Sequence, residues 1–174
     1  GFRSLRFEAT CPTGLGGTPP HLDFLAEGDE PVAVESKCTE WMLAKTSYFS
    51  PSYGRLLDSH GHSPWFKLIE YLRIHPNHYE FLDCAQLVKH AMGLIARYGA
   101  RRVRLIYLFW EPGNSADFPE CRRHHAEAKD LADRVNECSV QLVPKTYRDL
   151  WTGWERSGAP PSLPYLRTRY DRAV

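Results

Sequence analysis

One segment constrains the fold more than any other. Residues 103–110 (VRLIYLFW) are almost entirely apolar and rich in residue types that favour strands. Pro112 and Gly113 follow directly and end the run. A strand with one face in water alternates between polar and apolar residues, whereas an unbroken apolar run indicates a strand covered on both faces. The chain must therefore provide elements on both sides of a central strand.

Helical patterns lie on either side of this strand in the sequence. Residues 80–98 carry a broad apolar face at helical spacing, and Gly99 ends the pattern. Residues 118–136 form a charged amphipathic pattern, followed by a short strand at 139–143. A short helix is predicted around residues 63–72, and a last one at 146–156 with Thr146 as its N-cap. Helices that connect strands indicate crossovers in a sheet with parallel strands.

Three short strands come first. The predicted ranges are 5–10, 21–26 and 31–39, and residues 13–20 form a loop rich in Gly, Thr and Pro. The strands and the two long helices follow in the order three strands, a helix, a strand, a helix and a strand. This order predicts an α/β fold with a mixed sheet, in which an antiparallel three-stranded meander is joined by further strands and flanked by helices.

Composition excludes several classes. The 174 residues fit a domain of ordinary size, and 43% hydrophobic with 25% charged residues argues against disorder. The formal charge of +1 predicts no strong overall attraction to nucleic acid or acidic membranes. No apolar run approaches the roughly 18 residues that span a bilayer, so no membrane partner is expected. Five cysteines without CxxC spacing make a disulfide framework unexpected, and we expect a reduced, cytoplasmic protein.

The third strand carries an unusual pair of charges. Glu35 and Lys37 project from the same face, and the apolar residues before them predict a buried strand. If the preceding turn is centred near Asp29, Asp23 lies opposite Glu35, with Cβ atoms roughly 4.5–5.5 Å apart. Two carboxylates this close repel each other and raise a pKa unless a cation, either Lys37 or a divalent metal, lies between them. Removal of either acid should then maintain or raise the stability of the metal-free protein.

These residues resemble a known superfamily. Asp23, followed after eleven residues by Glu35-Ser36-Lys37 on an adjacent strand, is similar to the motif of the PD-(D/E)XK nucleases. The following helix and buried strand agree with the restriction-endonuclease-like fold, and the resemblance covers roughly residues 5–143. Residues 32–40 look like a bacterial restriction-endonuclease-like group. The proline of the motif stands earlier than usual here, at Pro20.

The resemblance implies a metal-dependent hydrolysis of DNA. Asp23, Glu35 and the backbone carbonyl of Ser36 would bind Mg²⁺, with Mn²⁺ as a substitute, and Lys37 would orient the nucleophile. Relatives carry Gln-x-x-x-Tyr on the long helix, where this chain has Gln86 and, four residues later, His90. Gln86 is therefore a candidate catalytic residue. Cleavage of both strands of a duplex commonly needs two sites, which makes a homodimer possible.

Other readings of the same residues remain open. Glu35 and Lys37 also suit a simple salt bridge, and Gln86 and His90 suit the polar edge of an ordinary helix. Glu8 is either a third carboxylate of the site or the partner of an arginine. A protein of the same fold with an idle metal site would instead bind nucleic acid or another protein without cleaving it.

The C-terminal region combines basic and aromatic residues. We predict a nuclease-like domain at residues 1–157 and an extended basic, aromatic tail at 158–174. Arg167, Arg169 and Arg172 in this tail are candidate contacts to nucleic acid. The alternative for the preceding Trp151 and Trp154 is that they fasten the last helix to the core.

Two further sets of residues suit metals less well. Cys121, His124, His125 and Cys138 permit a zinc interpretation, although most of them fall within one charged helix. His60 and His62 belong to a loop rich in Ser, Gly and Pro, where histidines are usually solvated.

Overall fold

The computed structural model describes residues 1–15, 18–54 and 63–174. His60 and His62 lie outside the described residues. Five strands form one sheet in the order β1-β2-β3-β4-β5. Their bounds are β1 (Phe2–Thr10), β2 (His21–Gly28), β3 (Val32–Lys37), β4 (Val103–Phe109) and β5 (Val140–Thr146).

The sheet is mixed, as predicted. Strands β1, β2 and β3 pair antiparallel, and β4 and β5 continue the sheet parallel to β3. The apolar run of residues 103–110 forms β4, which lies between β3 and β5, and most of its side chains are buried. Its two parallel neighbours and the helices beside it explain why this strand lacks polar alternation.

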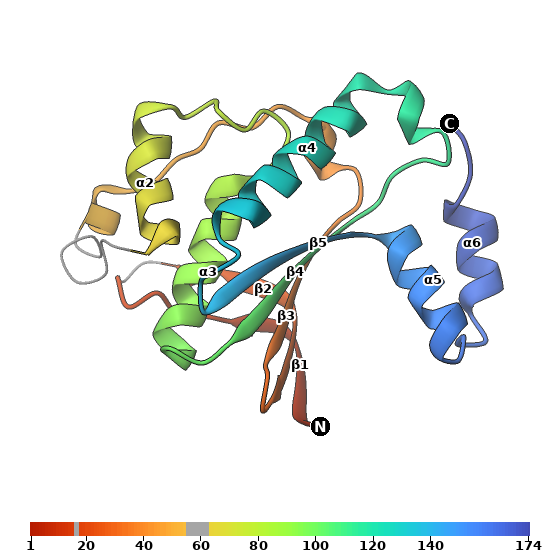
Figure 1. Ribbon diagram of the computed structural model, residues 1–174, viewed down its shortest axis with the longest axis horizontal. Helices are drawn as coiled ribbons and strands as arrows, with labels where there is room; N and C mark the ends of the chain where they lie inside the picture. Colours follow the sequence, from red (N-terminus) through yellow and green to blue (C-terminus); the bar gives the residue numbers. More distant parts are fainter. Residues whose placement is uncertain (16–17, 55–62) are drawn as a thin grey trace.

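Helices occupy both sides of the sheet (Figure 1). In Figure 1, α2, α3 and α4 lie on one side, and α5 and α6 lie on the other, near the carboxyl end of β5. The α-helices of the described chain are α2 (Pro64–Ile74), α3 (Cys84–Tyr98), α4 (Pro119–Arg134), α5 (Tyr147–Ser157) and α6 (Leu163–Tyr170). Short 3-10 helices occur at Glu40–Met42, Pro51–Tyr53 and Ser115–Asp117. The predicted α/β class with flanking helices is confirmed.

Helix α3 begins four residues later than the sequence pattern predicts. The side chain of Asp83 caps the helix by accepting a hydrogen bond of 3.0 Å from the backbone N–H of Gln86. The N–H groups of residues 80, 81 and 82 donate instead to the buried carboxylate of Glu127 on α4, at 2.8–3.0 Å. Because α4 satisfies these three donors, residues 80–82 need no helical turn.

Helix α3 packs very closely against the chain that leads into β2. A Cβ atom added at Gly93 would lie 2.1 Å from the backbone oxygen of Cys11, closer than atoms can approach. The backbone N–H of Cys11 in turn donates to the carbonyl of Pro20, at 2.9 Å, just before β2 begins. A backbone-to-backbone contact therefore sets the distance between α3 and this end of the sheet.

Helix α5 starts as the sequence predicts. Thr146 is its N-cap, and Thr146 and Asp149 exchange hydrogen bonds in a capping box. Trp151, on the buried side of this helix, is only 3% exposed, which confirms that it fastens α5 to the rest of the protein. Trp154 is half-buried.

The expectation of an extended tail at 158–174 is wrong. Residues 163–170 form helix α6, and Leu163 at its start is buried. The chain after α6 returns to the loop behind β4, where Gly113 donates its N–H to the carbonyl of Arg172 at 2.7 Å. These long-range contacts make the segment part of the fold. Within the part of the chain that the structure describes, no helix has the length and apolar character needed to cross a membrane.

Candidate functional site

Glu35 is the centre of a buried polar cluster on β3. Its side chain is 3% exposed and faces α3. The oxygen Oε1 lies 2.7 Å from Nζ of Lys37 and accepts a hydrogen bond of 2.7 Å from Nε2 of Gln86. The predicted pair on one face of the strand is thus present, and Gln86 joins it from the helix.

His90 completes this cluster from one helical turn beyond Gln86. Its Nε2 lies 3.0 Å from Oε2 of Glu35, and both residues are buried. The two groups are close but do not align as a hydrogen bond, so Oε2 of Glu35 and both ring nitrogens of His90 lack a hydrogen-bond partner within the described chain. A buried carboxylate oxygen without a hydrogen bond is costly unless another group approaches it.

The pKa of Glu35 reflects this crowded setting. Burial is the largest influence and raises the pKa, because it disfavours the charged carboxylate. The neighbouring His90 and Lys37 act in the opposite direction and together outweigh burial, so the pKa of Glu35 lies below its ordinary value. Lys37 is therefore a cation in direct contact with Glu35, one of the two candidates for the charge beside this acid.

Asp23 lies on β2 at the point where its pairing with β3 ends. The last registered pair is Phe24–Val34, so Asp23 comes opposite Glu35, as the turn near Asp29 predicts. The carboxylate oxygen Oδ2 of Asp23 accepts a hydrogen bond of 2.6 Å from the N–H of Ser36. Asp23 and Glu35 therefore face each other across neighbouring strands.

The pKa of Asp23 is raised, in contrast to that of Glu35. Burial is the main cause, and the negative charges of Glu35 and Glu8 add to it, while the N–H of Ser36 acts against it. Asp23 has no cation in direct contact within the described chain. Ionised Asp23 is thus the member of the pair that an additional cation would stabilise most.

Glu8 falls between the registered pairs Phe7–Phe24 and Ala9–Leu22, which places it opposite Asp23 on β1. Its φ of 48° lies in the left-handed region, which non-glycine residues rarely occupy. Glu8 is exposed and pairs with no arginine that the structure describes. Among the described residues, no group of three or more His, Cys, Asp or Glu side chains is arranged to hold a metal. The possible third carboxylate is therefore not part of a three-acid cluster.

The zinc interpretation of residues 121, 124, 125 and 138 is also wrong, because their side chains form no metal-binding group within the described chain. His124 is buried, with Nε2 2.9 Å from the hydroxyl of Tyr107, and burial lowers its pKa to about 3. His125 instead lies 2.9 Å from Glu111. The two histidines serve different local contacts and do not converge with Cys121 and Cys138 within the described chain.

The donor set at Asp23 and Glu35 fits a hard cation. Two carboxylates, one with a raised pKa and one with an unpartnered oxygen, provide negative oxygen atoms on adjacent strands. Mg²⁺ prefers oxygen ligands and retains several waters, so two acids and one carbonyl suffice. The backbone N–H of Ser36, the residue between Glu35 and Lys37, lies 2.6 Å from Asp23, so the backbone of Ser36 runs beside the two carboxylates.

A small cavity of about 40 Å³ lies beside Lys37. Its lining residues include Glu40, Lys45 and Asp83, so charged groups surround it. A cavity needs roughly 10–15 Å³ of accessible space to hold one water molecule. Lys37 therefore borders a small space, lined by charged and aromatic residues, in which a water molecule fits.

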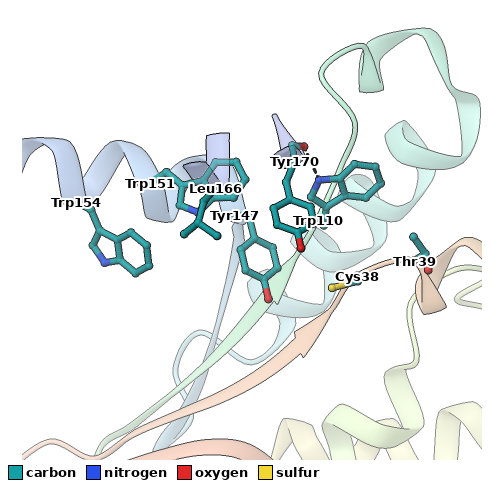
Figure 2. Close-up of a pocket in the computed structure, with 8 residues that line it drawn as sticks. All are labelled: Cys38, Thr39, Trp110, Tyr147, Trp151, Trp154, Leu166 and Tyr170. Carbon is teal, nitrogen blue, oxygen red and sulfur yellow. Dashed lines mark hydrogen bonds between the residues drawn. The ribbon is translucent and has the colours of Figure 1, made fainter. Parts of the chain in front are cut away.

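Ser36 connects the site with the opposite side of β3. Its Oγ lies 2.6 Å from the hydroxyl of Tyr147, at the start of α5. Tyr147 also lines an apolar pocket formed by α5, α6 and the residues after β3 and β4 (Figure 2). No local sequence pattern indicates this contact, because 111 positions separate the two residues.

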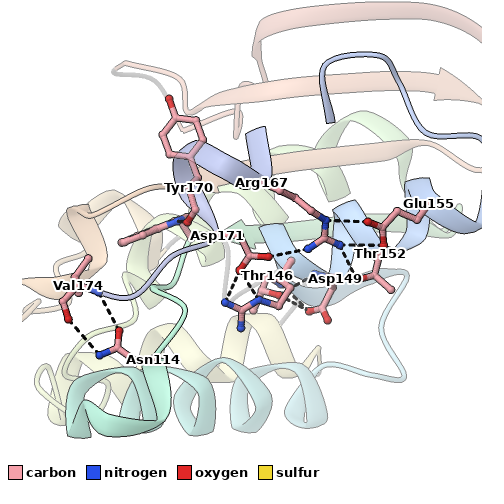
Figure 3. A network of polar contacts seen from close by, with 11 residues as sticks. Asn114, Thr146, Asp149, Thr152, Glu155, Arg167, Tyr170, Asp171 and Val174 are labelled. Carbon is pink, nitrogen blue, oxygen red and sulfur yellow. Dashed lines mark hydrogen bonds and ion pairs between the residues drawn. The ribbon is translucent and has the colours of Figure 1, made fainter. Parts of the chain in front are cut away.

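Arg167, one of the predicted nucleic-acid contacts, has acidic partners within the protein. Its guanidinium donates to Asp171 at 2.7 Å and to Glu155 at 3.0 Å, within the polar network that joins α5 and α6 (Figure 3). Arg167 thus stabilises the packing of two helices. Arg169 is exposed and donates to the hydroxyl of Tyr165 at 2.8 Å, whereas Arg172 is exposed and forms no ion pair with a described residue.

Comparison with known proteins identifies a family. A family model described as Restriction Endonuclease associating with ARP matches residues 1–171, a range that includes Asp23, Glu35, Lys37 and Gln86. No curated protein and no solved structure gave a significant match. The family match extends through α5 and α6, so both helices belong to the family's common region. The chain is a member of the restriction-endonuclease-like family Restriction Endonuclease associating with ARP.

Proposed function

We propose that this protein is a metal-dependent nuclease of the PD-(D/E)XK type that hydrolyses phosphodiester bonds of DNA. One observation carries the proposal: Lys37 contacts the buried Glu35 at 2.7 Å while Asp23 faces Glu35 from the adjacent strand. This is the arrangement that the motif requires. The family membership supports the nuclease class.

In this proposal the acidic residues hold the metal ion. Asp23, Glu35 and the carbonyl of Ser36 would bind Mg²⁺, and Mn²⁺ would substitute for it. The bound ion would supply a Lewis acid for the phosphate and lower the pKa of a coordinated water. The raised pKa of Asp23 supports this assignment, since a nearby cation favours the charged form of that carboxylate.

Lys37 has two tasks. Its ammonium borders the cavity of about 40 Å³, where it would orient a water molecule as the nucleophile. The same charge would stabilise the negative charge that develops on the phosphate in the transition state. Gln86 holds Oε1 of Glu35 through its amide, and it thereby positions the carboxylate relative to Lys37.

Cleavage of plasmid and linear DNA in Mg²⁺, with EDTA as the metal-free control, tests the proposal. Asp23→Asn and Lys37→Met should abolish cleavage, whereas Lys67→Met, an exposed lysine on α2, should cleave like the wild type. Wild-type cleavage by Asp23→Asn would show that the site is elsewhere. If the wild-type protein binds DNA but does not cleave it with Mg²⁺ or Mn²⁺, the idle binding module of the same fold is correct instead.

The family's description also names an association with ARP. We extend this association to the present chain as part of the proposal. Co-elution of the purified chain with ARP in size-exclusion chromatography would support it, and separate elution at micromolar concentrations would contradict it.

A further inference from the structure

An apolar pocket lies directly behind the candidate site. It has a volume of about 380 Å³, within the range of pockets that hold small organic groups. Five of its lining residues are aromatic, and Figure 2 shows that they gather from α5, α6 and the residue after β4. These residues are Trp110, Tyr147, Trp151, Trp154 and Tyr170.

The pocket and the candidate metal site share one strand. The hydroxyl of Tyr147 contacts Oγ of Ser36 at 2.6 Å, and the N–H of the same Ser36 contacts Asp23 at 2.6 Å. Cys38, the residue after Lys37, also lines the pocket. Glu35 and Lys37 project to one side of β3 and Ser36 projects to the other, so the pocket lies on the opposite face of the strand that carries the proposed reaction centre.

An exposed cation lies near this pocket. Ser36 is registered with Leu108, and Leu108 with Lys145, so these three residues share one face of the sheet. Lys145 is exposed, stands two residues before Tyr147 and forms no ion pair with any residue that the structure describes. An aromatic pocket with a free cation beside it matches the two components of a nucleotide, a flat base and a charged phosphate.

We propose that this pocket binds an unstacked nucleobase of the DNA strand that reaches the candidate site. This inference rests on the proposed nuclease function and adds the substrate class, which is single-stranded DNA or a base turned out of a duplex. Aromatic rings stack on every base, and the pocket's lining is almost entirely apolar. Binding is therefore expected to tolerate many sequences.

Tyr170 is the best residue for a test. It is 41% exposed, and its backbone carbonyl, not its side chain, accepts the hydrogen bond from the indole N–H of Trp110 at 2.8 Å. Tyr170→Leu therefore removes a stacking ring and leaves this contact in place. Tyr165 on the same helix is 61% exposed and does not line the pocket, so Tyr165→Leu is the matched control.

The experiment measures binding of a fluorescent oligothymidine and of the corresponding duplex by anisotropy, in EDTA so that no cleavage occurs. The wild type should prefer the single strand. Tyr170→Leu should weaken single-strand binding by about five- to 150-fold, the loss expected for one stacked base. Tyr165→Leu should bind like the wild type, and Tyr170→Phe, which retains the ring, should restore binding. Thermal melting of each variant confirms that it is folded.

The outcomes separate this inference from the proposed function. Equal single-strand binding by Tyr170→Leu and the wild type would overturn the proposal that this pocket binds a nucleobase, even if the wild type cleaves DNA. Equal losses in Tyr170→Leu and Tyr165→Leu would also overturn it. A selective loss in Tyr170→Leu supports the pocket, and it does so even if the wild type shows no metal-dependent cleavage.

Discussion

Replacement of Glu35 by Gln tests the electrostatics of the buried cluster. Glutamine has nearly the same shape, and its side-chain oxygen still accepts a hydrogen bond from Gln86. The substitution removes the negative charge and replaces the other carboxylate oxygen by an NH2 group. Lys37, at 2.7 Å, and His90, at 3.0 Å, then lose the carboxylate that faces them. The sequence alone predicts that removal of one of two opposed acids leaves stability unchanged or higher, whereas these contacts predict the opposite for Glu35.

The size of the effect follows from burial. Removal of one partner of a buried ion pair typically costs about 3–5 kcal/mol, because the other charge remains without compensation. The Lys37 side chain is 18% exposed, so water recovers part of this loss, and we expect about 2–4 kcal/mol. For a chain of this length, 1 kcal/mol corresponds to a Tm change of about 2–4 °C. The Tm of Glu35→Gln should therefore fall by about 4–16 °C at pH 7.

The pH dependence gives a second measurement, made in EDTA by urea unfolding. The pKa of Glu35 is lowered in the folded state, so its carboxylate stabilises the fold above the ordinary glutamate range. That contribution is lost as the pH falls through the folded pKa, and the deficit of Glu35→Gln should shrink on acidification. The pKa of Asp23 is raised, so its ionisation costs stability at neutral pH, and Asp23→Asn should be at least as stable as the wild type there.

Two results would refute this reasoning. Glu35→Gln with wild-type stability at pH 7 would mean that the carboxylate does not compensate Lys37. A deficit that grows as the pH is lowered would mean that the pKa of Glu35 is raised, as the repulsion between the two acids alone would require.

Four further substitutions test other parts of the structure. Lys37→Met retains the aliphatic stem, so calorimetry should still detect Mn²⁺ binding while cleavage falls by orders of magnitude; loss of Mn²⁺ binding would make Lys37 only a counter-ion of the metal site. Arg167→Gln should lower the Tm and leave the salt dependence of DNA binding unchanged, because its partners are Glu155 and Asp171. Arg172→Gln should leave the Tm unchanged and flatten the slope of log K for DNA binding against log salt concentration by about one unit. An unchanged slope would exclude a phosphate contact. Glu127→Gln should lower the free energy of unfolding by about 1–3 kcal/mol, because three backbone N–H groups depend on this carboxylate; an unchanged urea midpoint would contradict that dependence.

Local periodicity was enough to predict the centre of the site. A hairpin centred near Asp29 determines which residues of β2 and β3 face each other, so Asp23 and Glu35 follow from counting along two strands. Helical spacing likewise places Gln86 and His90 on one face of α3. His90 also suits the polar edge of an ordinary helix, but its position four residues after Gln86 brings it to the same side as Glu35.

Contacts between distant segments were beyond this kind of reasoning. The start of α3 depends on Glu127, a residue of α4 more than 40 positions away. Arg167 of the helix at residues 163–170 contacts acidic partners on α5 and after α6, and an alternating basic and aromatic pattern does not reveal such pairing. Tyr147 meets Ser36 only because α5 returns to the sheet.

The contact at Gly93 means that the geometry of the candidate site depends on a residue that takes no part in its chemistry. Gln86 and His90 reach Glu35 from a helix whose distance from the sheet is set where Gly93 meets the backbone of Cys11. Even one methyl group at position 93 would have to push that helix away, so a variant could keep every charged residue of the site and still lose the geometry between them. In a natural variant of this protein, a residue other than glycine at position 93 would therefore indicate a different backbone path in the segment before β2. It would not by itself indicate a change in the reaction.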